Sequence, residues 1–323
     1  MVFKRLLGTL GVGGPVVDTV LDPVSAVPGG TLSGQVDLKG GKADFTIDHI
    51  TLELIARVEA EHEHGESDGT VVFHRISVGG GFRLNEDEHR SVPFAFPLPF
   101  ETPVTELHGQ PLGIVLGVRT ELGVAGAKDK GDLDPLTVRP LPIQEAVLEA
   151  LGRLGFGFKS ADLEYGQIRG TGQQLPFYQE IELTPAARYA SEVGEIEVTF
   201  LASQAGLEVV IEADRRGGHF QGGHDALTRF TYTHEDAATR DWTTEVETWM
   251  NQLLAHHGGH GAHHGDGDHH GHRSGPGMGT VVAAGAAGVA VGVVGGMVAA
   301  EAVDEIGDFF EGDEDEGEDD DEA

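Results

Sequence analysis

Residues 195–214, EIEVTFLASQAGLEVVIEAD, decide the fold class. Apolar and polar side chains alternate with a period of two on both sides of a turn-like break at 202–206. The apolar set is Ile196, Val198, Phe200, Leu207, Val209, Ile211 and Ala213. Alternation of this kind buries one face of a strand and leaves the other in water. The stretch therefore predicts two antiparallel strands joined by a tight turn, with a single buried face.

The same pattern occurs in the N-terminal half. Leu32, Val36 and Leu38 alternate with polar residues, and residues 50–58 place Ile50, Leu52, Leu54 and Val58 on one face. We expect the opposing side chains, Glu53, Arg57 and Glu59, to lie in water. Gly- and Pro-rich turns, such as Pro28-Gly29-Gly30 and Gly79-Gly80-Gly81, separate the strands. The predicted fold class is mainly β: two antiparallel β-sandwiches in tandem, few short helices and a disordered C-terminal tail.

Helical spacing occurs in two places. Ile143, Val147, Leu151 and Leu154 recur at 3.6-residue intervals after Pro140-Leu141-Pro142. A second stripe, preceded by Asp241 as a plausible N-cap, consists of Trp242, Val246, Trp249, Met250 and Leu253. This second stripe either docks on the body of the protein or binds a protein partner. The short stretch 3–10 is a candidate for a third helix.

These patterns divide the chain into six parts. We expect an N-terminal sandwich over residues 1–139 and a C-terminal sandwich over 140–240 that opens with a linker helix near 143–154. An amphipathic helix follows at 241–254. Three compositionally distinct segments complete the chain: a His- and Gly-rich linker at 255–278, a Gly/Ala/Val-rich apolar segment at 279–300 and an acidic tail at 301–323.

The charge and the cysteine content exclude several functions. The chain has 323 residues and a formal net charge of −33. Such a charge repels phosphate backbones, so we expect no nucleic-acid partner. Without cysteine there is no disulfide, no thiolate metal site and no cysteine nucleophile. The N-terminal stretch after Lys4-Arg5 is too rich in glycine for a signal peptide, and we expect a cytoplasmic protein.

The order of several short motifs resembles a known family. The chain opens with Phe3-Lys4-Arg5-Leu6-Leu7, continues through Gly13-Gly14 and 17–21, and then carries Val27-Pro28-Gly29-Gly30-Thr31-Leu32-Ser33-Gly34. Together with the segments 92–99, 163–166 and 213–218, this order is similar to the bacterial sporulation-control proteins of the SpoOM type. The resemblance covers about residues 1–223. It implies an arrestin-like fold and a role in development, cell-cycle or stress control.

One short stretch matches a catalytic sequence motif but lacks the structural context that the motif requires. Gly65-Glu66-Ser67-Asp68-Gly69 matches the G-x-S-x-G elbow of hydrolases. That chemistry needs an apolar strand before the serine and a helix after it, whereas a charged stretch precedes Ser67 and a strand pattern follows it. We therefore expect a solvated hairpin tip, and no enzyme.

The His-rich linker is a candidate metal binder. Eight imidazoles spaced by glycine lie within 17 residues: His256, His257, His260, His263, His264, His269, His270 and His272. Flexible imidazoles bind Zn, Ni or Cu loosely and with poor selectivity. The alternative is a disordered spacer whose charge rises below about pH 6.5. No other cofactor is expected.

The apolar segment 279–300 has 22 uncharged residues, long enough to cross a bilayer as a helix but without Leu, Ile or Phe. Gly288, Gly292 and Gly296 recur every four residues, a spacing that lets helix backbones touch. Three outcomes stay open: association with itself or with a partner helix, a weak membrane anchor, or disorder.

The leading functional hypothesis is a non-enzymatic, arrestin-like adaptor or regulator that acts in sporulation, development or stress control through protein–protein interaction. Its partners would be developmental or cell-cycle regulators, or a second copy of the chain. The alternatives are a scaffold held at a membrane by residues 279–300, either peripheral or single-pass, and a divalent-metal binder that uses the His-rich linker.

Overall fold

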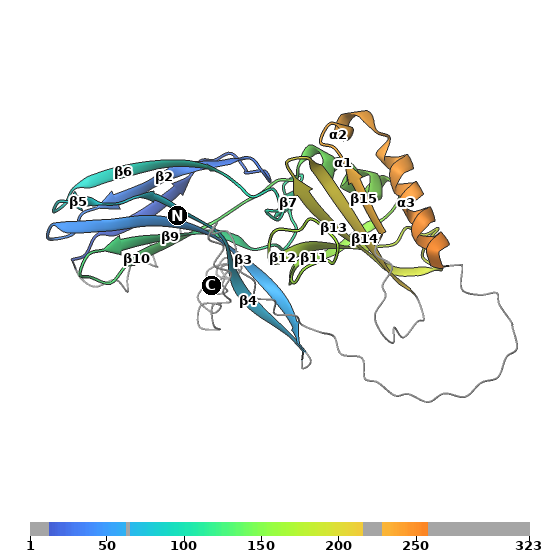
Figure 1. Cartoon of the computed structure of the whole chain (residues 1–323), viewed down its shortest axis with the longest axis horizontal. Helices are drawn as coiled ribbons and strands as arrows, with labels where there is room; N and C mark the ends of the chain where they lie inside the picture. Colours follow the sequence, from blue (N-terminus) through green and yellow to red (C-terminus); the bar gives the residue numbers. More distant parts are fainter. Residues whose placement is uncertain (1–12, 63–64, 216–227, 258–323) are drawn as a thin grey trace, which may run out of the picture.

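A computed structural model describes residues 13–62, 65–215 and 228–257 of the chain (Figure 1). These residues form two lobes, and the short β7–β8 hairpin lies between them, beside the second lobe. The first lobe contains β1 (Val16–Leu21), β2 (Thr31–Lys39), β3 (Phe45–His62), β4 (Gly65–Gly79), β5 (Phe82–Leu84), β6 (His89–Pro97), β9 (Leu116–Val124) and β10 (Lys130–Pro135). The hairpin consists of β7 (Glu106–Leu107) and β8 (Gln110–Pro111), and β11–β15 with three helices form the second lobe.

The first lobe is a sandwich of two sheets. One sheet has the order β1-β2-β6, and the other contains β10, β9 and β3, with β4 and β5 also paired to β3. The alternating residues Leu32, Val36 and Leu38 are buried between the sheets together with Ile50, Leu52 and Leu54. The predicted alternation and the sandwich of this lobe are thus confirmed.

Strand β3 connects the two lobes. It is 18 residues long, and near its end Glu59 pairs in parallel with Glu164 of the second lobe. The larger sheet therefore continues from β3 into the second lobe. Phe73 of β4 also packs edge-to-face on Phe177, with ring centroids 5.7 Å apart. The domain boundary near residue 139 stays a prediction, because both the sheet and this packing cross it.

The second lobe is one antiparallel sheet covered by helices. Its elements are α1 (Pro142–Arg153), β11 (Gly157–Tyr165), β12 (Phe177–Thr184), β13 (Val193–Ser203), β14 (Gly206–Arg215), β15 (Thr228–Tyr232), α2 (Asp236–Thr239) and α3 (Trp242–His257). Figure 1 shows α1 and α3 on the same side of the sheet. The mainly β class with few helices is confirmed. In this lobe, however, the layer opposite the sheet is helical where we expected a second sheet, because α1 and α3 carry the apolar stripes that cover it.

Both predicted long helices are present, and local chemistry explains where they begin. α1 begins at Pro142, and the Gln144 side chain accepts a hydrogen bond from the Leu141 N–H at 2.8 Å. α3 follows Asp241, whose Oδ1 accepts the N–H groups of Thr243 and Thr244. Asp241 is thus the N-cap that the sequence predicts. α3 continues to His257, beyond the predicted end at 254. The candidate helix 3–10 lies outside the described residues.

The expectation that Glu53 lies in water is wrong. Its side chain is 3% exposed, because Arg75 on β4 and Arg119 on β9 lie directly across from it and both pair with its carboxylate. Arg119 Nε donates to Glu53 Oε2 at 2.7 Å. A carboxylate this deeply buried needs such partners to offset its lost hydration.

The Glu53 cluster predicts a stability effect. Glu53→Gln keeps the shape but removes the charge that two guanidinium groups face, so we expect the free energy of unfolding to fall by about 3 kcal/mol in urea denaturation. Glu121→Gln on β9 is the control, because its side chain is 48% exposed and its partner within the described part of the chain is His49. It should cost less than about 0.5 kcal/mol. Equal losses in the two variants would contradict this role for Glu53.

Candidate functional site: a groove between the lobes

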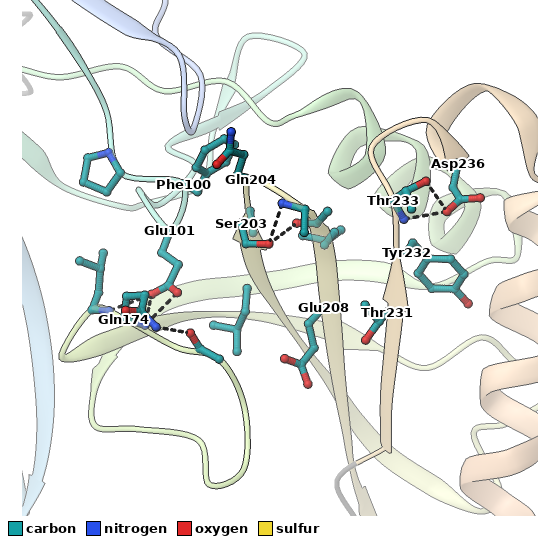
Figure 2. Close-up of a pocket in the computed structure, with 18 of the residues that line it drawn as sticks. Phe100, Glu101, Gln174, Ser203, Gln204, Glu208, Thr231, Tyr232, Thr233 and Asp236 are labelled. Carbon is teal, nitrogen blue, oxygen red and sulfur yellow. Dashed lines mark hydrogen bonds between the residues drawn. The ribbon is translucent and has the colours of Figure 1, made fainter.

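A groove of about 750 Å³ lies where the first lobe connects to the second. Residues 99–101, just after β6, form one wall, and the loop residues 172–175 form another. The remaining walls are the β13–β14 turn at 203–206 and the stretch from β15 into α2. Figure 2 shows Phe100 and Glu101 on one side of this space and Thr231, Tyr232 and Asp236 on the other. The groove is thus built from both lobes.

Glu101 holds the connecting segment on the second lobe. Its two carboxylate oxygens accept the Gln174 N–H, each at 2.8 Å, and Oε2 also accepts the Leu175 N–H at 2.8 Å. A second attachment lies at Val104, three residues after Glu101. The Gln179 side chain makes hydrogen bonds of 2.9 Å with both the backbone N–H and the backbone C=O of Val104. Partial burial raises the pKa of Glu101, which the two backbone N–H groups oppose.

The position of Gly29 beside Phe100 explains why the Pro28-Gly29-Gly30 turn needs a glycine at residue 29. Its φ is +69°, and a Cβ at this position would lie 2.3 Å from the Phe100 ring. Glycine adopts this left-handed conformation without strain, and only a residue without a Cβ allows this close approach. Phe100 in turn stacks on His234, with ring centroids 6.0 Å apart. The turn motif thereby positions an aromatic wall of the groove.

The groove combines apolar walls with an excess of acid. Pro99, Phe100, Leu201 and Tyr232 supply apolar surface, and Glu101, Glu208 and Asp236 supply carboxylates. Among the described residues, the one basic side chain that lines it is Arg240, which donates to Asp236 Oδ1 at 2.8 Å. That pair holds the pKa of Asp236 below its usual value. An apolar cleft with a few fixed polar groups is a typical binding site.

The polar residues described in and beside the groove do not form the arrangement that acyl transfer needs. The Ser203 hydroxyl donates to the Gly206 carbonyl and accepts from the Ala205 N–H, so it belongs to the turn. His234 Nε2 lies 2.8 Å from the backbone oxygen of Ser203, not from its hydroxyl. Asp236 accepts from Thr233. These residues form no nucleophile–base pair of the kind catalysis requires.

A second feature is the acidic face of the second-lobe sheet, the face that points away from α1 and α3. Carboxylates alternate there with the core residues of four neighbouring strands: Asp162, Glu164, Glu180, Glu182, Glu195, Glu197, Glu208 and Glu212. Carboxylate oxygens of Asp162, Glu164 and Glu180 lie within 4.8 Å of one another. Partial burial, together with the charges of its acidic neighbours, raises the pKa of Glu180 to about 8. The face repels anions and favours cations.

Comparison with known proteins gives the family. The SpoOM protein family matches residues 3–217. The chain belongs to this family. The sporulation-control protein spo0M of Bacillus subtilis (strain 168) is 36% identical over 261 residues, which are 78% of this chain and 97% of that protein. The crystal structure of Spo0M from Bacillus subtilis matches with a TM-score of 0.66 and 31% identity, covering 76% of this chain and 99% of that one.

In this SpoOM-family chain, the helix stripe predicted to bind a partner belongs to the core. All five side chains are at most 4% exposed: Trp242, Val246, Trp249, Met250 and Leu253. Trp249 stacks on Phe230, and its Nε1–H donates to the Tyr232 hydroxyl at 2.8 Å. The Tyr232 hydroxyl itself donates to Glu245 Oε2. The apolar stripe therefore docks on its own sheet and offers no free surface to a partner.

The other predicted site residues mostly lie outside the described residues. Of the eight histidines, His256 and His257 lie at the end of α3, and the other six fall in the undescribed stretch after it, as do Gly288, Gly292 and Gly296. Metal binding and helix association there stay predictions. Among the described helices, none has the length and apolarity required to span a membrane. Ser67 of the elbow-like string is exposed, as expected, but it lies inside β4, paired with Ala60 of β3, where we expected a hairpin tip.

No local pattern in the sequence marks the groove residues. Glu101 contacts residues 73 and 74 positions away, and Gln179 contacts Val104 at a separation of 75. The acidic face was more visible, because Glu195, Glu197 and Glu212 alternate with apolar residues in the quoted strands. Alternation within one strand does not show which residues lie opposite on the next strand, so it did not predict that the cross-strand neighbours are also acidic.

Glu180 predicts a pH-dependent stability. Its pKa, about 8 in the folded chain, lies well above the ordinary value of a free glutamate, so the folded state holds a proton that the unfolded state releases. The contribution of this carboxyl to stability should therefore fall by about 3 kcal/mol as pH rises from 5.5 to 8, and Glu180→Gln should make the pH dependence of the whole chain shallower.

The matched control for that effect is Glu182→Gln on the same strand. Lys159 lies 2.8 Å from Glu182, and its hydrogen bond lowers the pKa of that carboxyl. Stability from Glu182 is lost only as pH falls through its folded pKa, below the tested range. Unfolding free energies at pH 5.5, 7 and 8 check both variants. The same slope in parent and Glu180→Gln would contradict the assignment.

Proposed function

We propose that this chain is a non-enzymatic regulator of sporulation, development or stress responses that acts by binding a protein partner in the groove between its lobes. Family membership supports the regulatory role, because the curated relative is a sporulation-control protein. The observation that carries the binding role is the groove itself: it has apolar walls, fixed polar groups and no catalytic pair among Ser203, His234 and Asp236.

The chemistry of the groove favours an extended protein segment as the partner. β15 ends the large sheet, so one of its edges is not paired with another described strand. Thr231 of β15 and Thr233, directly after it, are exposed and line the groove. A segment lying there would meet apolar surface from Pro99 and Phe100 and the carboxylates of Glu101 and Glu208. Segments that carry both apolar and basic side chains complement such a surface.

Substitution at the groove tests this function. Thr231→Arg places a long side chain in the groove from an exposed position and should weaken partner binding at least about tenfold, which corresponds to about 1.4 kcal/mol. Thr248→Arg is the matched control, because Thr248 is exposed on the outer side of α3 and does not line the groove. Proteins retained by the immobilised full chain from its own cells would be quantified for the parent and both variants.

The expected result is a set of proteins that binds the parent and Thr248→Arg but is depleted on Thr231→Arg. Circular dichroism melting of all three chains shows whether the fold is intact. If Thr231→Arg retains the same proteins in the same amounts, the groove is not the binding site.

A further inference from the structure

A three-residue cluster lies apart from the groove and from the acidic face. His108 is at the tip of the β7–β8 hairpin, and Glu145 and Glu149 are one turn apart on α1. His108 Nδ1 lies 3.2 Å from Glu145 Oε1, and Nε2 lies 3.6 Å from Glu149 Oε1. One ligand atom from each residue lies within 4.8 Å of the others. Two elements distant in sequence thus bring an imidazole and two carboxylates together.

Both elements are held in place by their own contacts. His108 and Gly109 have φ values of +51° and +77°, as a two-residue hairpin turn with both central residues left-handed requires. The base of this hairpin is fixed because the Thr105 N–H donates to the Val138 carbonyl. On the other side, α1 is anchored in the second-lobe core by Ile143, Val147 and Leu151. The cluster therefore rests on two supported elements.

We propose that His108, Glu145 and Glu149 form a binding site for a divalent transition-metal ion, with Zn²⁺ as the representative ion. Zinc binds imidazole nitrogen at about 2.0–2.1 Å and carboxylate oxygen at about 2.0–2.2 Å. Two ligand atoms 3.2 Å apart can therefore contact one ion between them. The imidazole favours Zn²⁺ over Ca²⁺ and Mg²⁺, which prefer oxygen ligands. Three protein ligands leave a fourth position for water.

The surroundings allow an ion to enter. The side chains of His108, Glu145 and Glu149 are 53%, 41% and 42% exposed, so solvent reaches all three. One group competes with the metal: Arg153 Nη1 lies 3.1 Å from Glu149 Oε2. A bound ion would link the hairpin, which lies between β6 and β9, to α1 of the second lobe. Because this arrangement requires the folded chain, binding would stabilise the fold.

Thermal unfolding of the full chain with and without Zn²⁺ tests the proposal. We expect Zn²⁺ at about ten times its dissociation constant to raise the Tm of the parent by about 3 °C. His108→Ala should lose this rise. His49→Ala is the matched control and should keep it, because His49 is similarly exposed (42%) but pairs with the single carboxylate of Glu121. All three chains retain the His-rich linker, so metal uptake there cancels in the comparison.

Two further measurements, one on an Arg153 variant and one with Ca²⁺, test the ligands and the choice of ion. Arg153→Ala releases Glu149 from its guanidinium and should lower the Zn²⁺ concentration needed for half of the Tm rise. Ca²⁺ at the same concentrations should not reproduce the His108-dependent rise. The proposal is overturned if Zn²⁺ leaves the parent Tm unchanged, or if it raises the Tm of His108→Ala as much as that of the parent.

Discussion

The hydrogen bonds of the Glu101 carboxylate are the interaction on which the groove depends. They attach the segment after β6 to the backbone of residues 174 and 175, and Gln179 repeats the attachment at Val104. Hydrogen bonds to a charged acceptor are stronger than neutral ones, and partial burial shields them from competing water. Without them, the wall that carries Phe100 would be held mainly by its packing on Gly29 and His234.

The second lobe differs from a sandwich because aromatic residues join its sheet to a helix. Trp249 lies on Phe230, Trp242 lies edge-on to Tyr232, and the buried indole N–H and tyrosine hydroxyl satisfy each other. α3 thereby covers the apolar face of the sheet, as the second sheet of the sandwich does in the first lobe. It leaves the opposite face of the sheet uncovered by α1 and α3, and that face carries the carboxylates. Lys159 offsets part of the repulsion there by pairing with Glu182 and Glu195.

The sequence predicted features that depend on local periodicity, and it failed where distant residues decide. Strands such as 195–214, the helix that opens near Pro142 and the N-cap Asp241 follow from spacing and capping within a few residues. Glu53 shows the limit: its position on the polar face was correct, but its burial depends on Arg75 and Arg119, 22 and 66 residues away. The stripe on α3 showed that an apolar face exists, and only the tertiary structure showed what covers it.

Amide hydrogen exchange at Gln174 and Leu175 tests most directly whether Glu101 holds the segment after β6 on the second lobe. The measurement compares the full chain with Glu101→Ala, and uses the amide of Val198 in the central strand β13 as an internal reference. We predict that exchange at both amides accelerates by about tenfold or more in the variant, the loss of about one charged hydrogen bond, while exchange at Val198 stays unchanged. Equal exchange at Gln174 and Leu175 in the two chains would contradict the role given to Glu101 and the account of how the groove is formed.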